Sequence, residues 1–177
     1  YNYLFVNFIT IGLFFFYIYQ KKRFTKKQKP FLYGWFFGFG YFLSNLYWVT
    51  ISLTFDENFN FLIPFALILI PSFLGIFYGF ATYCFFIINI KKPLSNLFLF
   101  SLLFGLAEFL RGNILTGFPW NLIAFSFSEN LEILQILSFI GTYGFNILCI
   151  SFFASPAIFI IRENKKEIFA CIIFLLS

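Results

Sequence analysis

The chain alternates long apolar stretches with short polar segments. A helix that crosses a bilayer needs about 20 apolar residues at a rise of about 1.5 Å each. Stretches of this kind, with the beginning of a last one, occur at residues 3–19, 31–53, 61–90, 94–110, 131–161 and 168–177. The apolar runs are continuous and do not alternate with a period of two, so they favour helices over the strands of an outer-membrane barrel. The pattern predicts an all-α, polytopic transmembrane helix bundle whose last helix is truncated.

Two of these stretches are too long for one upright helix. Residues 61–90 contain Pro64 and Pro71, so their first third is expected to be an interfacial stretch or a kinked turn. Residues 131–161 carry Glu132 near their start. This polar start predicts a helix that begins along the membrane surface.

Basic residues occur in every second loop. Eleven of the 12 Lys and Arg residues lie in three loops, at residues 21–29, 91–92 and 162–167. The two intervening loops, 54–60 and 111–130, carry acids and a single cation. Under the positive-inside rule the three basic loops are cytoplasmic and the other two lie on the external side. The formal net charge of +5 is therefore a topology signal, and no nucleic-acid partner is expected.

Composition narrows the function classes. Of the 177 residues, 61% are hydrophobic and 11% are charged, which is more apolar than a soluble domain of this size can cover. The chain has no histidine, which excludes Ser-His and Cys-His pairs and histidine metal ligands. Cys84, Cys149 and Cys171 each stand alone in an apolar stretch. They are predicted to be small buried hydrophobes, and no metal or cofactor is expected.

Two further features concern the ends of the chain and its glycines. The chain contains no methionine and stops inside an apolar run, so we expect an internal piece of a longer membrane protein. Gly34 and Gly38, and likewise Gly75 and Gly79, stand four residues apart. Small residues at this spacing let helices approach closely and predict helix packing.

Arg111 is the one cation outside the basic loops. It follows Leu94 by 17 residues, about 26 Å along a helix, which predicts a position at the outer interface. Glu108 precedes it at i,i+3 spacing, so the two side chains can face one another. One interpretation is an ion pair that caps the helix end and holds the next loop. The other is a guanidinium that binds a phosphate or carboxylate.

Arg111 is closely followed by an unusual segment, Thr116-Gly117-Phe118-Pro119-Trp120. The segment combines a flexible glycine, a rigid proline and two large aromatic residues. Irregular backbone near membrane depth requires internal partners or a wet cavity. Trp120 fits an anchor at the level of the lipid headgroups, or an arm that shapes a groove through which lipid enters. We therefore take Glu108, Arg111 and residues 116–120 as candidate lipid-binding residues.

Five short blocks stand in a recognisable order: Gly38-Phe39-Gly40-Tyr41-Phe42, Tyr47-Trp48, Ala107-Glu108-Phe109-Leu110-Arg111-Gly112, Thr116-Gly117-Phe118-Pro119-Trp120 and Gly141-Thr142-Tyr143-Gly144-Phe145-Asn146. In this order they resemble the membrane part of bacterial apolipoprotein N-acyltransferase. The Glu-x-x-Arg-Gly block followed by Thr-Gly-Phe-Pro-Trp is the specific element, and the resemblance is close over about residues 31–146. The family's Gly-Tyr pair is replaced here by Ala124-Phe125, which implies a stiffer, less polar arm.

The resemblance implies a multi-pass protein of the bacterial inner membrane that needs no cofactor. The family enzyme has eight spanning helices and a periplasmic nitrilase-like domain. A Glu-Lys-Cys triad in that domain takes an acyl chain from a phospholipid and passes it to the N-terminal diacylglyceryl-cysteine of a lipoprotein. None of the three cysteines here matches the family nucleophile, so we expect no catalytic residue in this chain and no activity of the chain alone. Its implied role is to hold lipid at the outer leaflet and to position the catalytic domain.

Two rival functions stay open at this stage. A small transporter or channel could use Glu108 and Arg111 as a gate, although only one such pair and no internal repeat are visible. A non-catalytic multi-pass scaffold is the other rival. The coding sequence after Ser177 distinguishes it from the enzyme, because only the enzyme continues into a soluble domain.

Overall fold

The computed structural model describes residues 4–24, 28–55, 57–114, 119–161, 168–169 and 171–173, with the backbone alone for Glu57 and Phe59. Within these residues every regular element is helical and there is no strand. Four helices in this part of the chain are long and apolar enough to cross a membrane: Leu4–Phe24, Asn60–Ile87, Pro93–Asn113 and Leu137–Ile161. The protein is an all-α transmembrane helix bundle, as the sequence predicts. The predicted loop at 162–167 and the end of the last segment, 174–177, lie outside the described residues.

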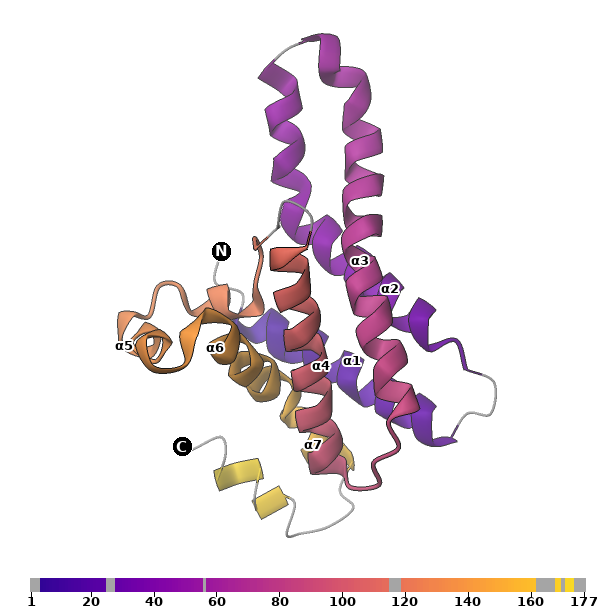
Figure 1. The fold of residues 1–177 in the computed structure, drawn as a ribbon, viewed down its shortest axis with the longest axis vertical. Coiled ribbons are helices and arrows are strands. Elements are labelled where there is room, and N and C mark those ends of the chain that lie inside the picture. The colour runs from indigo at the N-terminus through magenta and orange to yellow at the C-terminus, as the bar shows by residue number, and fades with distance from the viewer. Residues whose placement is uncertain are drawn as a thin grey trace.

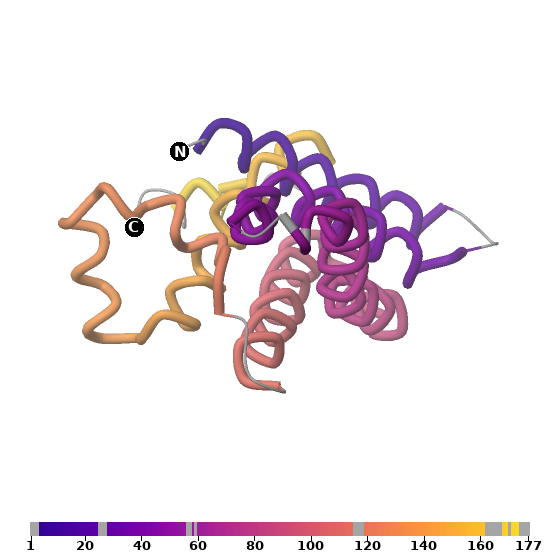
Figure 2. Tube along the Cα trace, turned by 90° about the horizontal axis from the view of Figure 1, so that it is seen from above, coloured from indigo at the N-terminus to yellow at the C-terminus, as the bar shows by residue number. Residues whose placement is uncertain are grey.

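The helices pack largely in the order of the sequence (Figure 1). The described elements are α1 (Leu4–Phe24), α2 (Pro30–Leu46), η1 (Tyr47–Phe55), η2 (Glu57–Leu62), α3 (Ile63–Ile87), α4 (Pro93–Asn113), η3 (Ile123–Phe127), α5 (Leu131–Leu134), α6 (Leu137–Ala154) and α7 (Pro156–Ile161). α3 packs between α2 and α4, α4 packs on α6, and α1 packs on α6 and α7. Seen from above, the segment from η3 to the start of α6 swings out to one side of the bundle (Figure 2).

The apolar run predicted as one helix over residues 31–53 divides at Tyr47. Beyond it the chain forms the 3-10 helix η1. The hydroxyls of Thr50, Ser52 and Thr54 donate to carbonyl oxygens three residues earlier, at 2.7, 2.6 and 2.8 Å, and such bonds favour a tight turn over a regular α-helix. Together α2 and η1 measure about 43 Å, more than the hydrocarbon core of about 30 Å. The α2–α3 hairpin accordingly projects beyond the end of α4 (Figure 1).

The stretch predicted at 61–90 begins irregularly, but only briefly. The chain is in the 3-10 helix η2 up to Leu62, and α3 then starts with Pro64 in its first turn. Proline fits there because the first turn leaves its backbone N–H groups without intrahelical partners anyway. Pro71 lies inside α3, which continues to Ile87. Only residues 61–62 of the stretch precede α3, so the expectation of an irregular first third is wrong.

The stretch predicted at 131–161 is divided by Gly141. This glycine has φ 70° and ψ 169° within α6, a conformation that residues with a Cβ avoid. Before it, Leu131 and Phe139 are 77% and 87% exposed. The residues from α5 to Gly141 are thus set apart from the packed part of α6, and their position along a membrane surface stays a prediction.

Glycines bring α2 and α3 into direct backbone contact. A Cβ at Gly34 would lie 2.2 Å from the carbonyl oxygen of Tyr78, and one at Gly38 would lie 2.9 Å from Cα of Gly75. By contrast, a Cβ at Gly40 would meet nothing within 4 Å. Close approach of this kind is what small residues four positions apart permit. The predicted helix packing is therefore the contact between α2 and α3.

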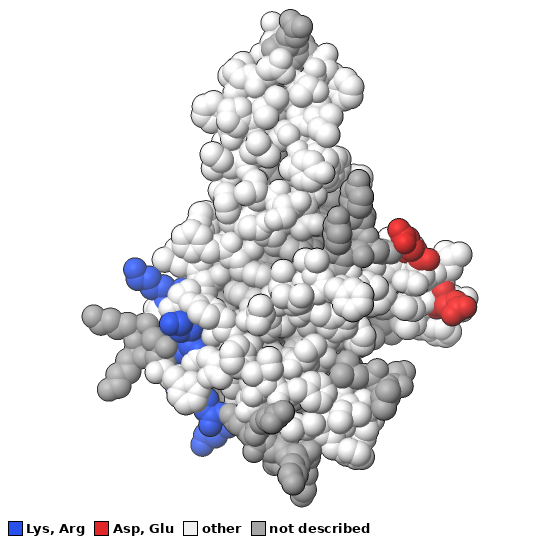
Figure 3. Space-filling model, turned by 180° about the vertical axis from the view of Figure 1, so that it is seen from behind, with Lys and Arg blue, Asp and Glu red and all other residues white. Residues whose placement is uncertain are grey.

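The charged side chains separate to opposite flanks of the described protein. On the face shown in Figure 3 the Lys and Arg side chains gather at one flank and the Asp and Glu side chains at the other. The exposed acids described are Glu129 and Glu132. The described cations other than Arg111 belong to the end of α1, the residue before α2 and the turn between α3 and α4. The packing of the helices thus gathers basic segments that are far apart in the sequence.

Candidate functional site

Glu108 and Arg111 lie one turn apart near the end of α4 and face one another, as their spacing predicts. Arg111 Nη2 is 3.3 Å from Glu108 Oε2. Glu108 is fully buried and Arg111 is only 2% exposed, so protein encloses the pair. A charge pair withdrawn from water needs additional hydrogen bonds to offset its lost hydration.

Those additional hydrogen bonds come from two other helices. Tyr78, on α3, donates its hydroxyl to Glu108 Oε1. Asn146, on α6, donates its amide Nδ2 to Glu108 Oε2 at 3.4 Å. With the guanidinium of Arg111, three donors from α3, α4 and α6 therefore meet on one carboxylate. Charge-assisted hydrogen bonds of this type are the stronger ones in proteins.

The same group of side chains holds the backbone of the loop after α4. Arg111 Nη1 donates to the carbonyl oxygen of Trp120 at 2.8 Å. The hydroxyl of Tyr41, on α2, donates to the carbonyl oxygen of Asn121 at 3.3 Å. The backbone N–H of Ala124 donates to Oδ1 of Asn146 at 2.9 Å. Residues 120–124 are therefore held at three points by three helices.

Asn121 has the left-handed backbone conformation, with φ 61°. Such a conformation is uncommon outside glycine, and asparagine tolerates it better than most residues. The hydrogen bonds on both sides of Asn121 hold the chain in this turn. The turn directs the side chain of Trp120 outward, where it is 56% exposed.

Arg111 matches the first of the two interpretations drawn from the sequence. It pairs with Glu108, holds the next loop, and its guanidinium carbon lies 4.9 Å from the ring centroid of Phe42. Among the described residues its Nε has no hydrogen-bond partner. Since Arg111 is enclosed, a lipid headgroup reaches it only if the loop that carries Trp120 moves. Direct contact with a phosphate stays a prediction.

An apolar groove of about 500 Å³ lies between η1 and Trp120. Its lining consists of Trp48, Val49, Ile51, Ser52, Phe55 and Trp120. The rings of Trp48 and Trp120 meet edge to face, with centroids 6.3 Å apart and planes at 69°. The loop held by Arg111 therefore forms one rim of this groove.

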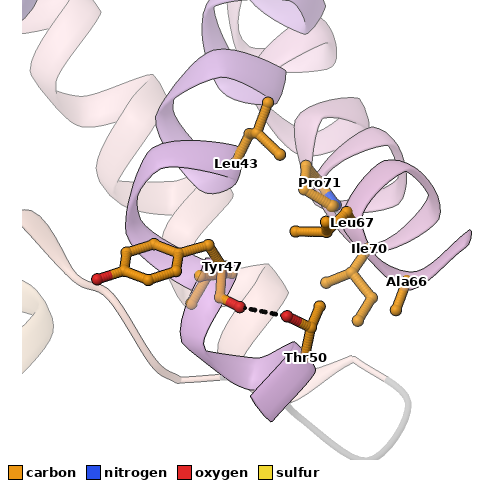
Figure 4. A pocket seen from close by; sticks show the side chains of 8 residues that line it. Leu43, Tyr47, Thr50, Ala66, Leu67, Ile70 and Pro71 are labelled. Carbon is orange, nitrogen blue, oxygen red and sulfur yellow. Dashed lines mark hydrogen bonds between the residues drawn. The ribbon is translucent and has the colours of Figure 1, made fainter. Parts of the chain in front are cut away.

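A second hollow lies between α2, η1 and α3 (Figure 4). Its volume is about 10 Å³, which leaves room for one water molecule at most. The side chains around it include Leu43, Leu67, Ile70 and Pro71. We therefore treat it as a packing feature of the hairpin.

The structure brings part of the predicted site together. Glu108, Arg111 and Trp120 are connected by direct contacts, and Pro119 is exposed beside Trp120. Thr116, Gly117 and Phe118 lie outside the described residues.

Three participants were missed in the sequence: Tyr41, Tyr78 and Asn146. Asn146 carried a signal, because a lone amide inside an apolar helix requires a partner. Tyr41 was marked only by its place in the Gly38-Phe39-Gly40-Tyr41-Phe42 block, and nothing in the sequence distinguished Tyr78, since the chain has 10 tyrosines and 34 phenylalanines.

In the part of the chain that the structure describes, none of the three cysteines is hydrogen-bonded to this group. Cys149 and Cys171 are buried, and Cys84 is half-buried. Cys171 Sγ lies 3.8 Å from the carbonyl oxygen of Ser155. Among the described residues, no group of three His, Cys, Asp or Glu side chains could hold a metal ion.

Comparison with known proteins identifies relatives. Residues 1–155 match the family model described as the apolipoprotein N-acyltransferase N-terminal domain. The chain is 39% identical over 132 residues to the apolipoprotein N-acyltransferase of Rhodopseudomonas palustris, a match that covers 72% of this chain and 24% of the relative. The enzyme of the same name from Brucella melitensis is 39% identical over 126 residues, 71% of this chain and 24% of the relative. That from Rhizobium etli is 37% identical over 134 residues, 75% of this chain and 25% of the relative. The chain thus spans about a quarter of the length of the curated relatives it matches.

Proposed function

The chain belongs to the apolipoprotein N-acyltransferase family, and we propose that it is the membrane part of such an enzyme. In this proposal the enzyme transfers an acyl chain from a phospholipid to the N-terminal diacylglyceryl-cysteine of a lipoprotein. The catalytic Glu-Lys-Cys domain belongs to the part of the enzyme outside this chain. This chain matches only about a quarter of each relative, which supports a catalytic domain in the remaining part of the enzyme. The chain alone then holds lipid and positions the catalytic domain, without transferase activity of its own.

The groove between η1 and Trp120 is the observation that carries this proposal. It is lined by apolar side chains with one serine, and acyl chains favour such a surface. Tryptophan also suits the level of lipid headgroups. In this proposal residues 116–120 form the arm that contacts the phospholipid, while Glu108 and Arg111 hold that arm from behind.

The first test concerns this site. In the full-length enzyme, Arg111→Ala and Trp120→Ala are expected to lower acyl transfer about tenfold or more, the effect of losing one charge-assisted hydrogen bond or one apolar anchor. The measurement is transfer from phospholipid to a diacylglyceryl-lipopeptide, divided by the amount of enzyme in the membrane. Lys91→Ala is the control, because it removes an exposed cation from the opposite side of the bundle. Normal transfer at normal abundance removes the altered residue from the site.

We further propose that the protein lies in the bacterial inner membrane. The basic loops 21–29, 91–92 and 162–167 are cytoplasmic in this proposal, and loops 54–60 and 111–130 are periplasmic. The positive-inside rule supports this orientation. So does the separation of basic and acidic side chains to opposite flanks in Figure 3.

Labelling of single cysteines tests this orientation. In the full-length enzyme with every native cysteine replaced by alanine, including the three of this chain, Glu129→Cys is expected to react with a membrane-impermeant maleimide in intact spheroplasts. Lys91→Cys is expected to react only after lysis. Both positions are exposed, so accessibility reports on the side of the membrane. The reverse pattern rejects the orientation and, with it, the placement of the groove at the outer leaflet.

A further inference from the structure

The loop from Trp120 to Ala124 is attached to the bundle through its backbone. Arg111 binds the carbonyl oxygen of Trp120, and Asn146 binds the N–H of Ala124. Because these are main-chain groups, the attachment does not depend on which side chains the loop carries. What the attachment fixes is the place of the Trp120 ring beside Trp48.

The two side chains that bind the loop, Arg111 and Asn146, also contact the carboxylate of Glu108. Arg111 Nη2 lies 3.3 Å from Oε2 of Glu108, and Nδ2 of Asn146 lies 3.4 Å from the same oxygen. Asn146 is therefore the side chain that contacts the loop at one end and the ion pair at the other. It is fully buried, so water does not compete for either contact.

The two contacts require an amide. The N–H of Ala124 needs an acceptor, which Oδ1 supplies, and the carboxylate of Glu108 needs a donor, which Nδ2 supplies. Only a side chain with an acceptor and a donor on one short stem does both. Aspartate keeps the shape and the acceptor, but it sets a second carboxylate against Glu108. Leucine keeps the approximate volume and makes neither contact.

From this geometry we propose that Asn146 is a positioning residue for phospholipid binding, acting through the loop that places Trp120 at the groove. The proposal rests on the proposed function of the groove. Asn146 is not one of the residues that line the groove, and its hydrogen bond to the loop goes to the N–H of Ala124, so its effect is transmitted by the backbone of residues 120–124. Variants of Asn146 should therefore change the apparent affinity for the lipid donor more than the rate of the chemical step.

The test is the kinetics of the full-length enzyme in mixed micelles of detergent and phosphatidylethanolamine. Asn146→Asp is expected to raise KM for the phospholipid about tenfold, in line with the loss of a buried hydrogen bond to a charged group. We expect kcat to change less than about threefold, since an interaction lost from substrate binding alone appears in KM. Asn130→Asp is the matched control, because Asn130 is exposed and lies outside the network.

A second variant removes both contacts without adding a charge. Asn146→Leu keeps the approximate volume but offers no acceptor to the N–H of Ala124 and no donor to Glu108. It is expected to raise KM for the phospholipid about tenfold or more, with kcat again changed less than about threefold, because the loop loses a buried backbone hydrogen bond. A role in general stability alone does not predict that KM rises while kcat stays nearly constant.

The outcomes distinguish the positioning role of Asn146 from the proposed function of the groove. If Asn146→Asp leaves KM unchanged while Trp120→Ala impairs transfer, the positioning role is wrong and the groove stands. If Trp120→Ala also leaves transfer unchanged, the proposed function of the groove fails first. If Asn146→Asp does not fold, Asn146→Leu decides, and an unchanged KM in Asn146→Leu overturns the positioning role.

Discussion

Glu108→Ala is expected to lower the free energy of unfolding by about 3–5 kcal/mol, as found when one partner of a buried ion pair is removed. The substitution leaves the guanidinium of Arg111, only 2% exposed, without the carboxylate that lies 3.3 Å from it. Tyr78 and Asn146 lose an acceptor at the same time. The measurement is unfolding of the purified full-length enzyme in a mild detergent, together with its abundance in the membrane.

Removing both charges is expected to cost less than removing one. A double variant, Glu108→Leu with Arg111→Leu, buries no unpaired charge, and apolar replacements of buried ion pairs are often close to neutral. Glu132→Ala is the control for loss of an exposed carboxylate. A Glu108→Ala protein as stable as the parent would show that this carboxylate does not stabilise Arg111. The loop after α4 would then need another anchor.

The class of fold could be predicted from the sequence because a helix that spans a bilayer must have a minimum length and a predominantly apolar composition. Each of the apolar stretches at 3–19, 61–90, 94–110 and 131–161 overlaps a helix long and apolar enough to cross a membrane. The division of residues 31–53 at Tyr47 could not be predicted from the sequence. It depends on hydroxyl groups that bond to nearby carbonyl oxygens, and α and 3-10 geometries differ little in energy over a few residues.

The break at Gly141 could not be predicted from the sequence either. A glycine in an apolar run can allow close helix packing or can bend the chain, and the sequence does not distinguish the two. A Cβ at Gly144 would lie 3.3 Å from Ile140, and one at Gly141 would meet nothing within 4 Å. The role of each glycine therefore follows from its neighbours in space. Sequence spacing identified the close contact of α2 and α3 but did not identify Gly141 as a bend.

At the candidate site, the sequence predicted local geometry and missed distant partners. The pairing of Glu108 with Arg111 follows from i,i+3 spacing on one helix. Tyr78 and Asn146 lie 30 and 38 residues from Glu108, so their contacts depend on how α3, α4 and α6 align. That alignment also decides the burial of Arg111, which the sequence placed at the outer interface.

The contact between α2 and α3 leads to the second large effect, expected for Gly34→Ala. The new methyl group would lie 2.2 Å from the carbonyl oxygen of Tyr78 and 2.3 Å from Oγ1 of Thr82. A backbone oxygen cannot move away without its helix, so α2 and α3 must separate. Overpacking of this kind typically costs about 1–3 kcal/mol, occasionally more, and we expect the upper end of that range because main-chain atoms are involved.

Gly40→Ala is the matched control in the same helix. Its methyl group would meet nothing within 4 Å, so it should gain up to about 1 kcal/mol from the better helix propensity of alanine. The measurement is the melting temperature of the two full-length variants in the same detergent, followed by acyl transfer. Because Tyr78 also donates to Glu108, separation of α2 from α3 should disturb the buried network, and Gly34→Ala should lose transfer as well as stability. If the two variants melt alike, the helices do not pack at Gly34, and the network loses the rigid support that α3 is inferred to give it.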